Sequence, residues 1–445
     1  MSTEPRNGAT DVEIGATVAA AFSVPVDPAT LTASTFTVNL GGARLAAPVS
    51  YDAATRTART PAPLLPGQTY EAILGTAVRG TDATALTQPH RWSFGTRAWR
   101  AVELDRSGIS TFFSSLTIDA TARRHVTFGS RARLLYGTCA AECDTPANWQ
   151  TLAVEDGSGG VTSVAVDPEG RVHVSYYDAT RADLRYAVCA SACTTLESWQ
   201  SVAVDETGDV GFLSSLVVDP ASVRHIAYYD AARRALRYAT CASGCTTAAN
   251  WALVTVDSRD DAGRSPSIAV DGAGRLHLAY YAGAAADLRY ATCALGCGLA
   301  ANWQSVTVDQ LGDVGAYASL ALGPGGGLHV SYVDAGAGRL KYATCRSGCG
   351  TAANWRSLAV DPAGAAPGWT SIAVDAFDRV HVSHHGGEHL KYATCATACT
   401  EAFNWQAVES GIPADSRSSI DLVVDAAGRV GIATAGASVE LVYIE

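Results

Sequence analysis

The densest group of residues able to do chemistry lies in the segment HVSHHGGEH, positions 381–389. Imidazole and carboxylate groups are common ligands of zinc and copper, and His384, His385, Glu388 and His389 supply both. Side chains alternate between the two faces of a strand, so His381 and His385 should share one face while His384 lies on the other. Two interpretations stay open: a metal site of two histidines plus Glu388, or a solvent-facing hairpin without a ligand. No other cofactor is predicted.

Twelve cysteines form six pairs with the spacing C-x-x-x-C. Zinc would need two pairs brought together or a nearby His, yet successive pairs lie about 50 residues apart. The haem-attachment pattern C-x-x-C-H is absent from the sequence. A local disulfide in each pair is the remaining interpretation, which places the protein at the cell surface, in the periplasm or outside the cell. The expected bridges are Cys139/Cys143, Cys189/Cys193, Cys241/Cys245, Cys293/Cys297, Cys345/Cys349 and Cys395/Cys399.

These pairs belong to a repeat of about 50 residues, and a Trp opens each of its seven units. Such a period, made of short β-type runs and turns, is typical of repeat folds. In one unit the expected strands are 163–167, 171–177, 183–188 and 199–205, with the first two joined by a D-x-x-G-R hairpin turn. Small residues on the first strand suit the crowded axis of a β-propeller. The opening residues are Trp99, Trp149, Trp199, Trp251, Trp303, Trp355 and Trp405.

The first and last units are incomplete in complementary ways. The chain ends after the third strand of the last unit, at 439–445, whereas the strand from Trp99 to Asp105 precedes the first complete unit. Pairing these two strands would close a ring and remove two exposed sheet edges. We therefore predict an all-β chain in which residues 97–445 form a seven-bladed β-propeller closed by the Trp99 strand. Each unit also has a serine at one position of its expected innermost strand, and we call this residue the guide serine. It recurs at Ser115, Ser163, Ser215, Ser267, Ser319, Ser371 and near Ser419.

Residues 1–96 alternate short β-type runs with Gly, Pro and Asp turn signals, which is typical of a β-sandwich. The segment resembles a bacterial Ig-like domain through AAFSVPVDPATL (20–31), STFTV (34–38), PGQTY (66–70) and the closing RWSF. That resemblance implies a spacer or presentation role. Trp92 and Trp99 are only seven positions apart, so we expect the two domains, 1–96 and 97–445, to be rigidly coupled.

The repeat itself resembles bacterial propellers whose blades carry S-I-A-V-D, V-H-V-S-Y-Y-D and Y-A-T-C phrases. No single activity is implied by that resemblance. The sialidase box S-x-D-x-G-x-T-W, the Trp-Asp blade ending and the Gly-Gly doublet of kelch repeats are missing.

Residues that recur in every unit are expected to have structural roles. The repeated Trp residues are expected to pack in or between blades. The repeated Asp of the hairpin turn is expected to form the turn, with calcium binding as the alternative. One His recurs on the second strand, where we expect a buried imidazole bonded to a neighbouring strand; a ring of ligands is the alternative. These histidines are His125, His173, His225, His277, His329 and His381.

Residues that vary between units are the better candidates for ligand binding. The position two residues before each guide serine should surround the mouth of the central channel, and aromatic and polar side chains there can hold sugar rings or peptides. The alternative is a simple plug of the channel mouth. The candidate ligand-binding residues are Phe113, Tyr317, Asp334, Trp369 and Arg417.

The formal net charge of −11 and the absence of a basic stripe exclude nucleic acid as an expected partner. No apolar run is long enough to span a membrane, and the first residues lack the apolar core of a signal peptide. No complete catalytic set stands out. The main hypothesis is a monomeric extracellular or cell-surface adhesion module that binds a glycan or a surface protein. The alternatives are a secreted polysaccharide lyase or hydrolase using the blade-six histidines, and a purely structural part of a larger assembly.

Overall fold

The computed structural model describes the whole chain except residues 106–112, 131–132, 157–159, 362–367, 414–418, 436–438 and 445. The described residues form strands and short 3₁₀ turns, in agreement with the predicted all-β class. None of the helices in this described part is long and apolar enough to cross a membrane.

The N-terminal domain is a sandwich of two sheets. Its core lies between the sheets and contains Phe36, Tyr70, Trp92 and Phe94, all buried. One sheet has the order β1 (Ser2–Glu4), β3 (Val18–Ala21), β7 (Thr57–Thr60), β6 (Ser50–Asp52). The other has the order β2 (Ala9–Val12), β9 (His90–Thr96), β8 (Thr69–Leu74), β4 (Phe36–Leu40), β5 (Ala43–Arg44).

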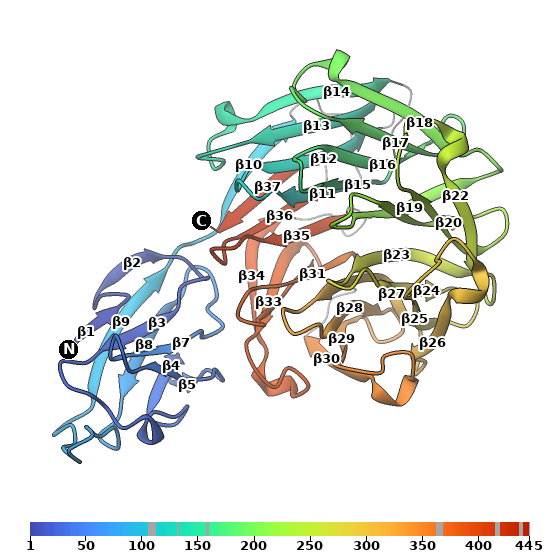
Figure 1. Cartoon of the computed structure of the whole chain (residues 1–445). Coiled ribbons are helices and arrows are strands. Elements are labelled where there is room, and N and C mark those ends of the chain that lie inside the picture. Colours follow the sequence, from blue (N-terminus) through green and yellow to red (C-terminus); the bar gives the residue numbers. More distant parts are fainter. Residues whose placement is uncertain are drawn as a thin grey trace.

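Seven four-stranded antiparallel sheets follow, arranged around a central axis (Figure 1). Blade one is β11 (Phe113–Ile118), β12 (Arg124–Ser130), β13 (Arg133–Cys139), β14 (Gln150–Asp156), and blade two is β15 (Thr162–Val166), β16 (Val172–Asp178), β17 (Asp183–Cys189), β18 (Trp199–Asp205). Blade three is β19 (Val210–Val218), β20 (Arg224–Asp230), β21 (Ala235–Cys241), β22 (Ala252–Asp257), and blade four is β23 (Ala262–Val270), β24 (Leu276–Ala282), β25 (Asp287–Cys293), β26 (Gln304–Asp309). Blade five is β27 (Val314–Leu322), β28 (Leu328–Asp334), β29 (Arg339–Cys345), β30 (Arg356–Asp361), and blade six is β31 (Thr370–Val374), β32 (Val380–His385), β33 (His389–Cys395), β34 (Gln406–Pro413).

Blade seven joins the two ends of the propeller. It consists of β35 (Ile420–Val424), β36 (Val430–Ala435), β37 (Val439–Ile444) and the N-terminal strand β10 (Arg100–Asp105). Strand β10 pairs antiparallel with β37, with Arg100 opposite Tyr443 and Val102 opposite Leu441. The predicted closure by the strand that follows Trp99 is therefore confirmed, and Figure 1 shows the two strands side by side.

The guide serines link neighbouring blades around the axis. The Ser115 hydroxyl accepts a hydrogen bond from the Val164 backbone N–H of the next blade, at 3.1 Å. The same bond recurs at the next five junctions, from Ser163, Ser215, Ser267, Ser319 and Ser371. At the junction of blades seven and one the acceptor is Asp421, whose Oδ2 lies 2.8 Å from the Leu116 nitrogen. The seventh guide residue is thus Asp421, two residues after the predicted position near Ser419.

The repeated Trp residues pack between blades, as expected. The ring of Trp251 in blade three lies 5.1 Å from the ring of Tyr186 in blade two, and equivalent Tyr–Trp pairs recur around the propeller. Trp99 completes the series against Tyr392, at 5.6 Å.

Disulfide bonds join the two cysteines of every C-x-x-x-C pair, in the loops that follow the third strands of blades one to six. The Cα atoms of each pair lie 5.7 to 5.8 Å apart, which is an ordinary span for a disulfide. All twelve cysteines are thereby paired, so the local bridges replace the zinc alternative and the prediction is confirmed. The bridges are Cys139–Cys143, Cys189–Cys193, Cys241–Cys245, Cys293–Cys297, Cys345–Cys349 and Cys395–Cys399.

The Ig-like domain packs against the turns of blades six and seven. Arg379 is fully buried there: its guanidinium pairs with Asp375 of its own turn at 2.5 Å and donates to the backbone oxygens of Ala62 and Gly15 in the Ig-like domain. Gly15 lies so close to the Gly428 backbone that a Cβ atom would stand 2.4 Å from the Gly428 oxygen. This buried contact supports the predicted close coupling of the two domains.

Candidate ligand-binding sites at the channel mouth and between the blades

Aromatic side chains from five blades meet at the mouth of the central channel. Phe113 of blade one contacts Trp369 of blade six and Phe212 of blade three, with ring centroids 5.5 and 6.0 Å apart. Tyr317 of blade five lies 4.8 Å from Trp369, and Tyr177 of blade two lies 5.6 Å from Phe212. Phe212 is exposed and the other four rings are half-buried. We call these five residues the aromatic mouth.

Local backbone geometry brings the longer strands of blades three, four and five to this position. Gly211 adopts a φ of 96°, and a Cβ there would lie 2.7 Å from Leu184 of the preceding blade, so only glycine fits. Each of the three strands bulges at this point and has a second residue in the left-handed region. In blade five that residue is Tyr317, at φ 54°. Leu213 and Ser265 stand at the same position in blades three and four, at φ 59° and 47°, so this conformation belongs to the repeated bulge of the long strands and places Tyr317 at the mouth.

Polar groups form a rim around the aromatic mouth. The Tyr177 hydroxyl donates to Asp209 of blade three at 2.9 Å, and the Tyr229 hydroxyl donates to Asp261 of blade four at 2.5 Å. Arg264 occupies the position in blade four that Phe212 occupies in blade three, and it pairs with Asp261 at 2.7 Å. The mouth therefore combines an apolar floor with charged and hydroxyl groups at its edge.

The other two predicted ligand-binding residues are not part of this cluster. Asp334 is buried at the end of β28, where it caps its own loop by accepting from the Ala337 N–H and pairing with Arg339 at 3.0 Å. Its carboxylate is thus hydrogen-bonded within its own loop, as are the carboxylates of Asp178 and Asp230 in blades two and three. Arg417 lies outside the described residues.

The blade-six histidines are not assembled as a metal site. Among the described residues, no group of three His, Cys, Asp or Glu is arranged to hold a metal ion. His384 and His385 are buried, Glu388 is exposed, and His389 pairs with Glu409 at 2.6 Å. The strand end buries two of the four side chains, so this arrangement does not support the metal interpretation, which stays a prediction, and it also differs from a fully solvent-facing hairpin.

His384 instead replaces a tyrosine that other blades use to contact their neighbour. In blade three the hydroxyl of Tyr228 donates to Asp205 of blade two at 2.7 Å, and Arg237 also pairs with Asp205. In blade six His384 takes the tyrosine position, 3.7 Å from Asp361 of blade five, while Lys391 pairs with Asp361 at 3.0 Å. Burial lowers the pKa of His384 to about 4.

The six equivalent histidines are buried and hydrogen-bonded, as the sequence predicts. In blade two, His173 Nδ1 lies 2.6 Å from the Tyr186 hydroxyl and Nε2 lies 2.9 Å from Asp167 Oδ2. An ionised carboxylate only accepts, so Nε2 carries the proton and the tyrosine donates to Nδ1. Burial lowers the pKa of His173 to about 4. Asp167 also accepts the Arg171 N–H of its turn, so one residue serves the turn and the histidine.

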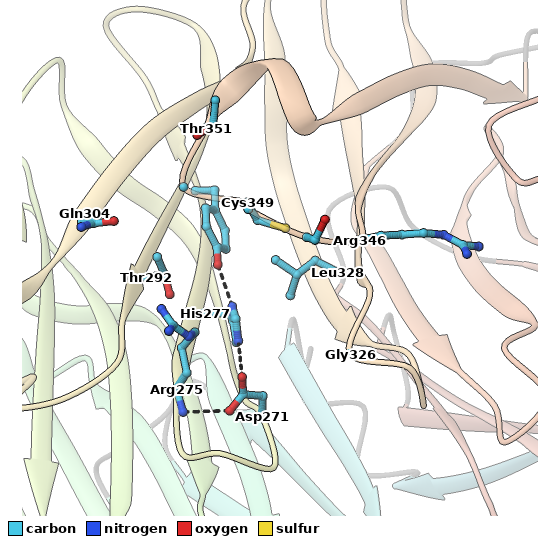
Figure 2. A pocket seen from close by; sticks show the side chains of 14 residues that line it. Asp271, Arg275, His277, Thr292, Gln304, Gly326, Leu328, Arg346, Cys349 and Thr351 are labelled. Carbon is cyan, nitrogen blue, oxygen red and sulfur yellow. Dashed lines mark hydrogen bonds and ion pairs between the residues drawn. The ribbon is translucent and has the colours of Figure 1, made fainter.

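Two of these His–Tyr–Asp units, and the His329–Tyr342 pair of blade five, line cavities between blades that were not predicted from the sequence. The cavity between blades four and five has a volume of about 510 Å³ and is lined by Asp271, Arg275, His277 and Gln304 of blade four (Figure 2). The disulfide loop 346–351 of blade five forms its opposite wall. Equivalent cavities of about 310 and 270 Å³ lie between blades one and two and between blades five and six. We call these three cavities the inter-blade clefts.

The second cysteine of a bridge lines each cleft. Cys193 lies in the wall between blades one and two, Cys349 between blades four and five, and Cys399 between blades five and six. All three are bonded to the first cysteine of their own loop. Because a disulfide sulfur carries no free thiol, these cysteines shape the walls and supply no nucleophile or metal ligand.

Only the pairing of neighbouring blades creates these clefts. Their residues come from one blade's hairpin turn and the next blade's C-x-x-x-C loop, which lie about 75 residues apart in blades four and five. The signal present in the sequence was the recurrence of Arg, His, Thr and Gln at fixed positions in several units. Because recurrence indicates a structural role, the cavity that these residues share was not predicted.

These features define a class of protein: a bacterial Ig-like domain joined to a seven-bladed β-propeller. Residues 1–96 match the family model of the bacterial Ig-like domain. The comparison with curated protein sequences gives no match.

Solved propeller structures resemble the chain in fold. Virginiamycin B lyase from Staphylococcus aureus has a TM-score of 0.51 at 9% identity, over 78% of this chain and 99% of that chain. A catalytically inactive variant of the same lyase with quinupristin has a TM-score of 0.51 at 10% identity, over 78% and 100%. The α-L-arabinanase of Penicillium chrysogenum has a TM-score of 0.48 at 10% identity, over 78% and 97%. The first two structures, with TM-scores of 0.51 at 9 and 10% identity, support the propeller fold and nothing beyond the fold.

Proposed function

We propose that this protein is a carbohydrate-binding module that acts outside the cytoplasm, in which domain 1–96 presents propeller 97–445. The observation that carries the proposal is the aromatic mouth, where five rings from five blades form one continuous surface. Sugar rings have apolar faces that stack on such surfaces, and their hydroxyls suit a rim of Tyr, Asp and Arg. The six disulfides fit an oxidising compartment.

Glycan-array binding of the full chain tests the proposal. Trp369 contacts two other rings of the mouth, so Trp369→Ala should interrupt the stacking surface and lower glycan affinity by about tenfold or more. Phe403→Ala is the matched control, because Phe403 is an exposed ring outside the mouth. An unchanged binding profile in Trp369→Ala would show that the mouth is only a plug of the channel.

The enzymatic alternative is tested with the same proteins. Two of the three histidines to which it assigned catalysis, His384 and His385, are buried, which leaves His389 as its accessible candidate. Glycans that bind should be incubated with the protein and analysed for shorter products by mass spectrometry. Products that appear with the wild type and vanish with Trp369→Ala would replace the binding function by catalysis.

A further inference from the structure

Each inter-blade cleft is lined by an arginine whose guanidinium has no bonding partner among the described residues. Arg123 lines the cleft between blades one and two, Arg275 and Arg346 line the cleft between four and five, and Arg346 also lines the cleft between five and six. Within the described part of the chain, none of these three guanidinium groups has a hydrogen bond or an ion pair. In contrast, Arg171 stands at the same turn position as Arg123 and Arg275, yet its Nε pairs with the turn carboxylate Asp167.

The remaining polar groups of the cleft complement these cations. Figure 2 shows the Arg275 side chain running along the cleft toward Thr292, with Gln304 on the same side. The Gln304 amide has no hydrogen bond within the described residues, and Gln150 repeats this arrangement between blades one and two. The carboxylate of Asp271 is already engaged, because Oδ1 accepts from the turn N–H groups and Oδ2 lies 3.4 Å from His277.

The junction of blades two and three shows what such a space accommodates. There the protein's own Arg224 is buried between the blades, and its Nη1 donates to the Ser222 oxygen and to the Ala242 oxygen of the disulfide loop. The corresponding residue beside the cleft of blades four and five is Leu328, which is too short to fill it. The space between the His–Tyr–Asp unit and the loop is therefore large enough for a planar group of the size of a guanidinium.

We propose that the three inter-blade clefts bind anionic sugar residues. The carboxylate or sulfate of the sugar pairs with the guanidinium in a bidentate manner, and its hydroxyls bond to the glutamine amide and to the loop backbone. The cleft volumes of about 270 to 510 Å³ suit one small polar group each. The inference takes its ligand class from the proposed function but concerns a different surface.

Several clefts on one molecule favour polymers over monomers. Blades four to six carry two adjacent clefts, so a polysaccharide with a charge on each residue can engage both. Linked binding events of this kind raise affinity by about 10² to 10⁴ without new contacts. We therefore expect an acidic polysaccharide to bind much more tightly than its monosaccharide.

The test uses the full chain and immobilised polysaccharides. Polygalacturonate and dextran sulfate present carboxylate and sulfate, while methyl-esterified polygalacturonate and dextran are their uncharged counterparts. We expect at least one acidic polymer to bind about tenfold or more tightly than its uncharged counterpart, and the pair that responds identifies the anion. Equal binding of charged and uncharged polymers overturns the proposal, and so does the absence of binding to both acidic polymers.

Variants then locate the binding. Replacing Arg123, Arg275 and Arg346 together by Gln should weaken acidic-polymer binding about tenfold or more, whereas Arg171→Gln, at the turn position of Arg123 and Arg275, should leave it unchanged. Leu328→Arg copies Arg224 and should block one cleft; its melting temperature checks that the propeller is intact. Trp369→Ala distinguishes binding at the aromatic mouth from binding in the inter-blade clefts. Acidic-polymer binding that Trp369→Ala abolishes and the arginine variants do not affect overturns the cleft proposal and leaves the proposed function standing.

Discussion

Asp421 is the only carboxylate among the seven guide residues of the inner ring, because the other six are serines. Its carboxylate accepts hydrogen bonds from the Ser115 and Ser371 hydroxyls on both sides and from the Leu116 N–H. Burial raises the pKa of Asp421 to about 6, although these donors favour the ionised form. A carboxyl group whose pKa is raised in the folded state costs stability as the pH rises from about 4 to above 6. A serine at this position would complete the ring without that cost.

Asp421→Ser should therefore stabilise the protein at neutral pH. We expect a gain of about 1 to 2 kcal/mol at pH 7.5 that largely disappears near pH 4, where Asp421 is protonated in the folded state and about half protonated in the unfolded state. Urea unfolding of the two proteins at both pH values measures the difference. The buried histidines, such as His173, act in the opposite direction, because their lowered pKa makes both proteins lose stability as the pH falls below about 6.5. A gain that persists at pH 4 would contradict the role assigned to the Asp421 charge.

The disulfide loops have a local role at the scale of the strands they connect. Each bridge closes a ring of only five residues, at the point where a blade's third strand ends and the next Trp strand begins. In the same loop the Trp355 indole N–H donates to the Cys349 oxygen at 2.9 Å, so the loop is held even without the bridge. The same bond recurs in the other five loops, where the acceptors are the oxygens of Cys143, Cys193, Cys245, Cys297 and Cys399. The bridges thus shape the walls of the clefts more than they hold the blades.

Replacing one bridge should leave the propeller folded. The double variant Cys345→Ser, Cys349→Ser is expected to lose roughly 2 kcal/mol at most, by the loop-closure estimate. The equivalent change of Cys241 and Cys245 is the control, because Arg224 fills the space beside that loop. Calorimetry and circular dichroism measure the effect. Loss of the folded state in either double variant would show that the bridges are needed to hold the blades together.

At the scale of the whole molecule, Arg379 decides how the two domains meet. Its turn position is the same as that of Arg171 in blade two, where the side chain is 34% exposed. In blade six the Ig-like domain covers the same side chain completely and accepts two of its hydrogen bonds. A repeated surface ion pair has thus become a buried contact between domains.

Arg379→Ala should destabilise the protein far more than Arg171→Ala. Removing Arg379 leaves the Asp375 carboxylate buried without its cation, which costs about 3 to 5 kcal/mol, whereas the exposed pair at Arg171 is worth about 1 kcal/mol or less. Chemical unfolding measures both values. Small-angle X-ray scattering of the folded Arg379→Ala variant should also show a wider spread of domain orientations. Equal effects of the two substitutions would mean that the domains are held by other contacts.

The blade number, the closing strand, the bridges and the buried histidines could be predicted from the sequence, because each depends on a pattern within one repeat or on the order of repeats. The clefts and the environment of His384 could not, because they arise where different blades meet. For the aromatic mouth the sequence indicated Phe113, Tyr317 and Trp369, whereas Phe212 and Tyr177 became apparent only in the structure. Phe113 and Trp369 are separated by most of the propeller in sequence yet touch across its axis. Asp421 illustrates the same division: its substitution for serine is visible in the sequence, but only the closed ring places its carboxylate between Ser371 and Ser115. Contacts of this kind depend on the three-dimensional closure of the ring, which sets the distances that local patterns leave undetermined.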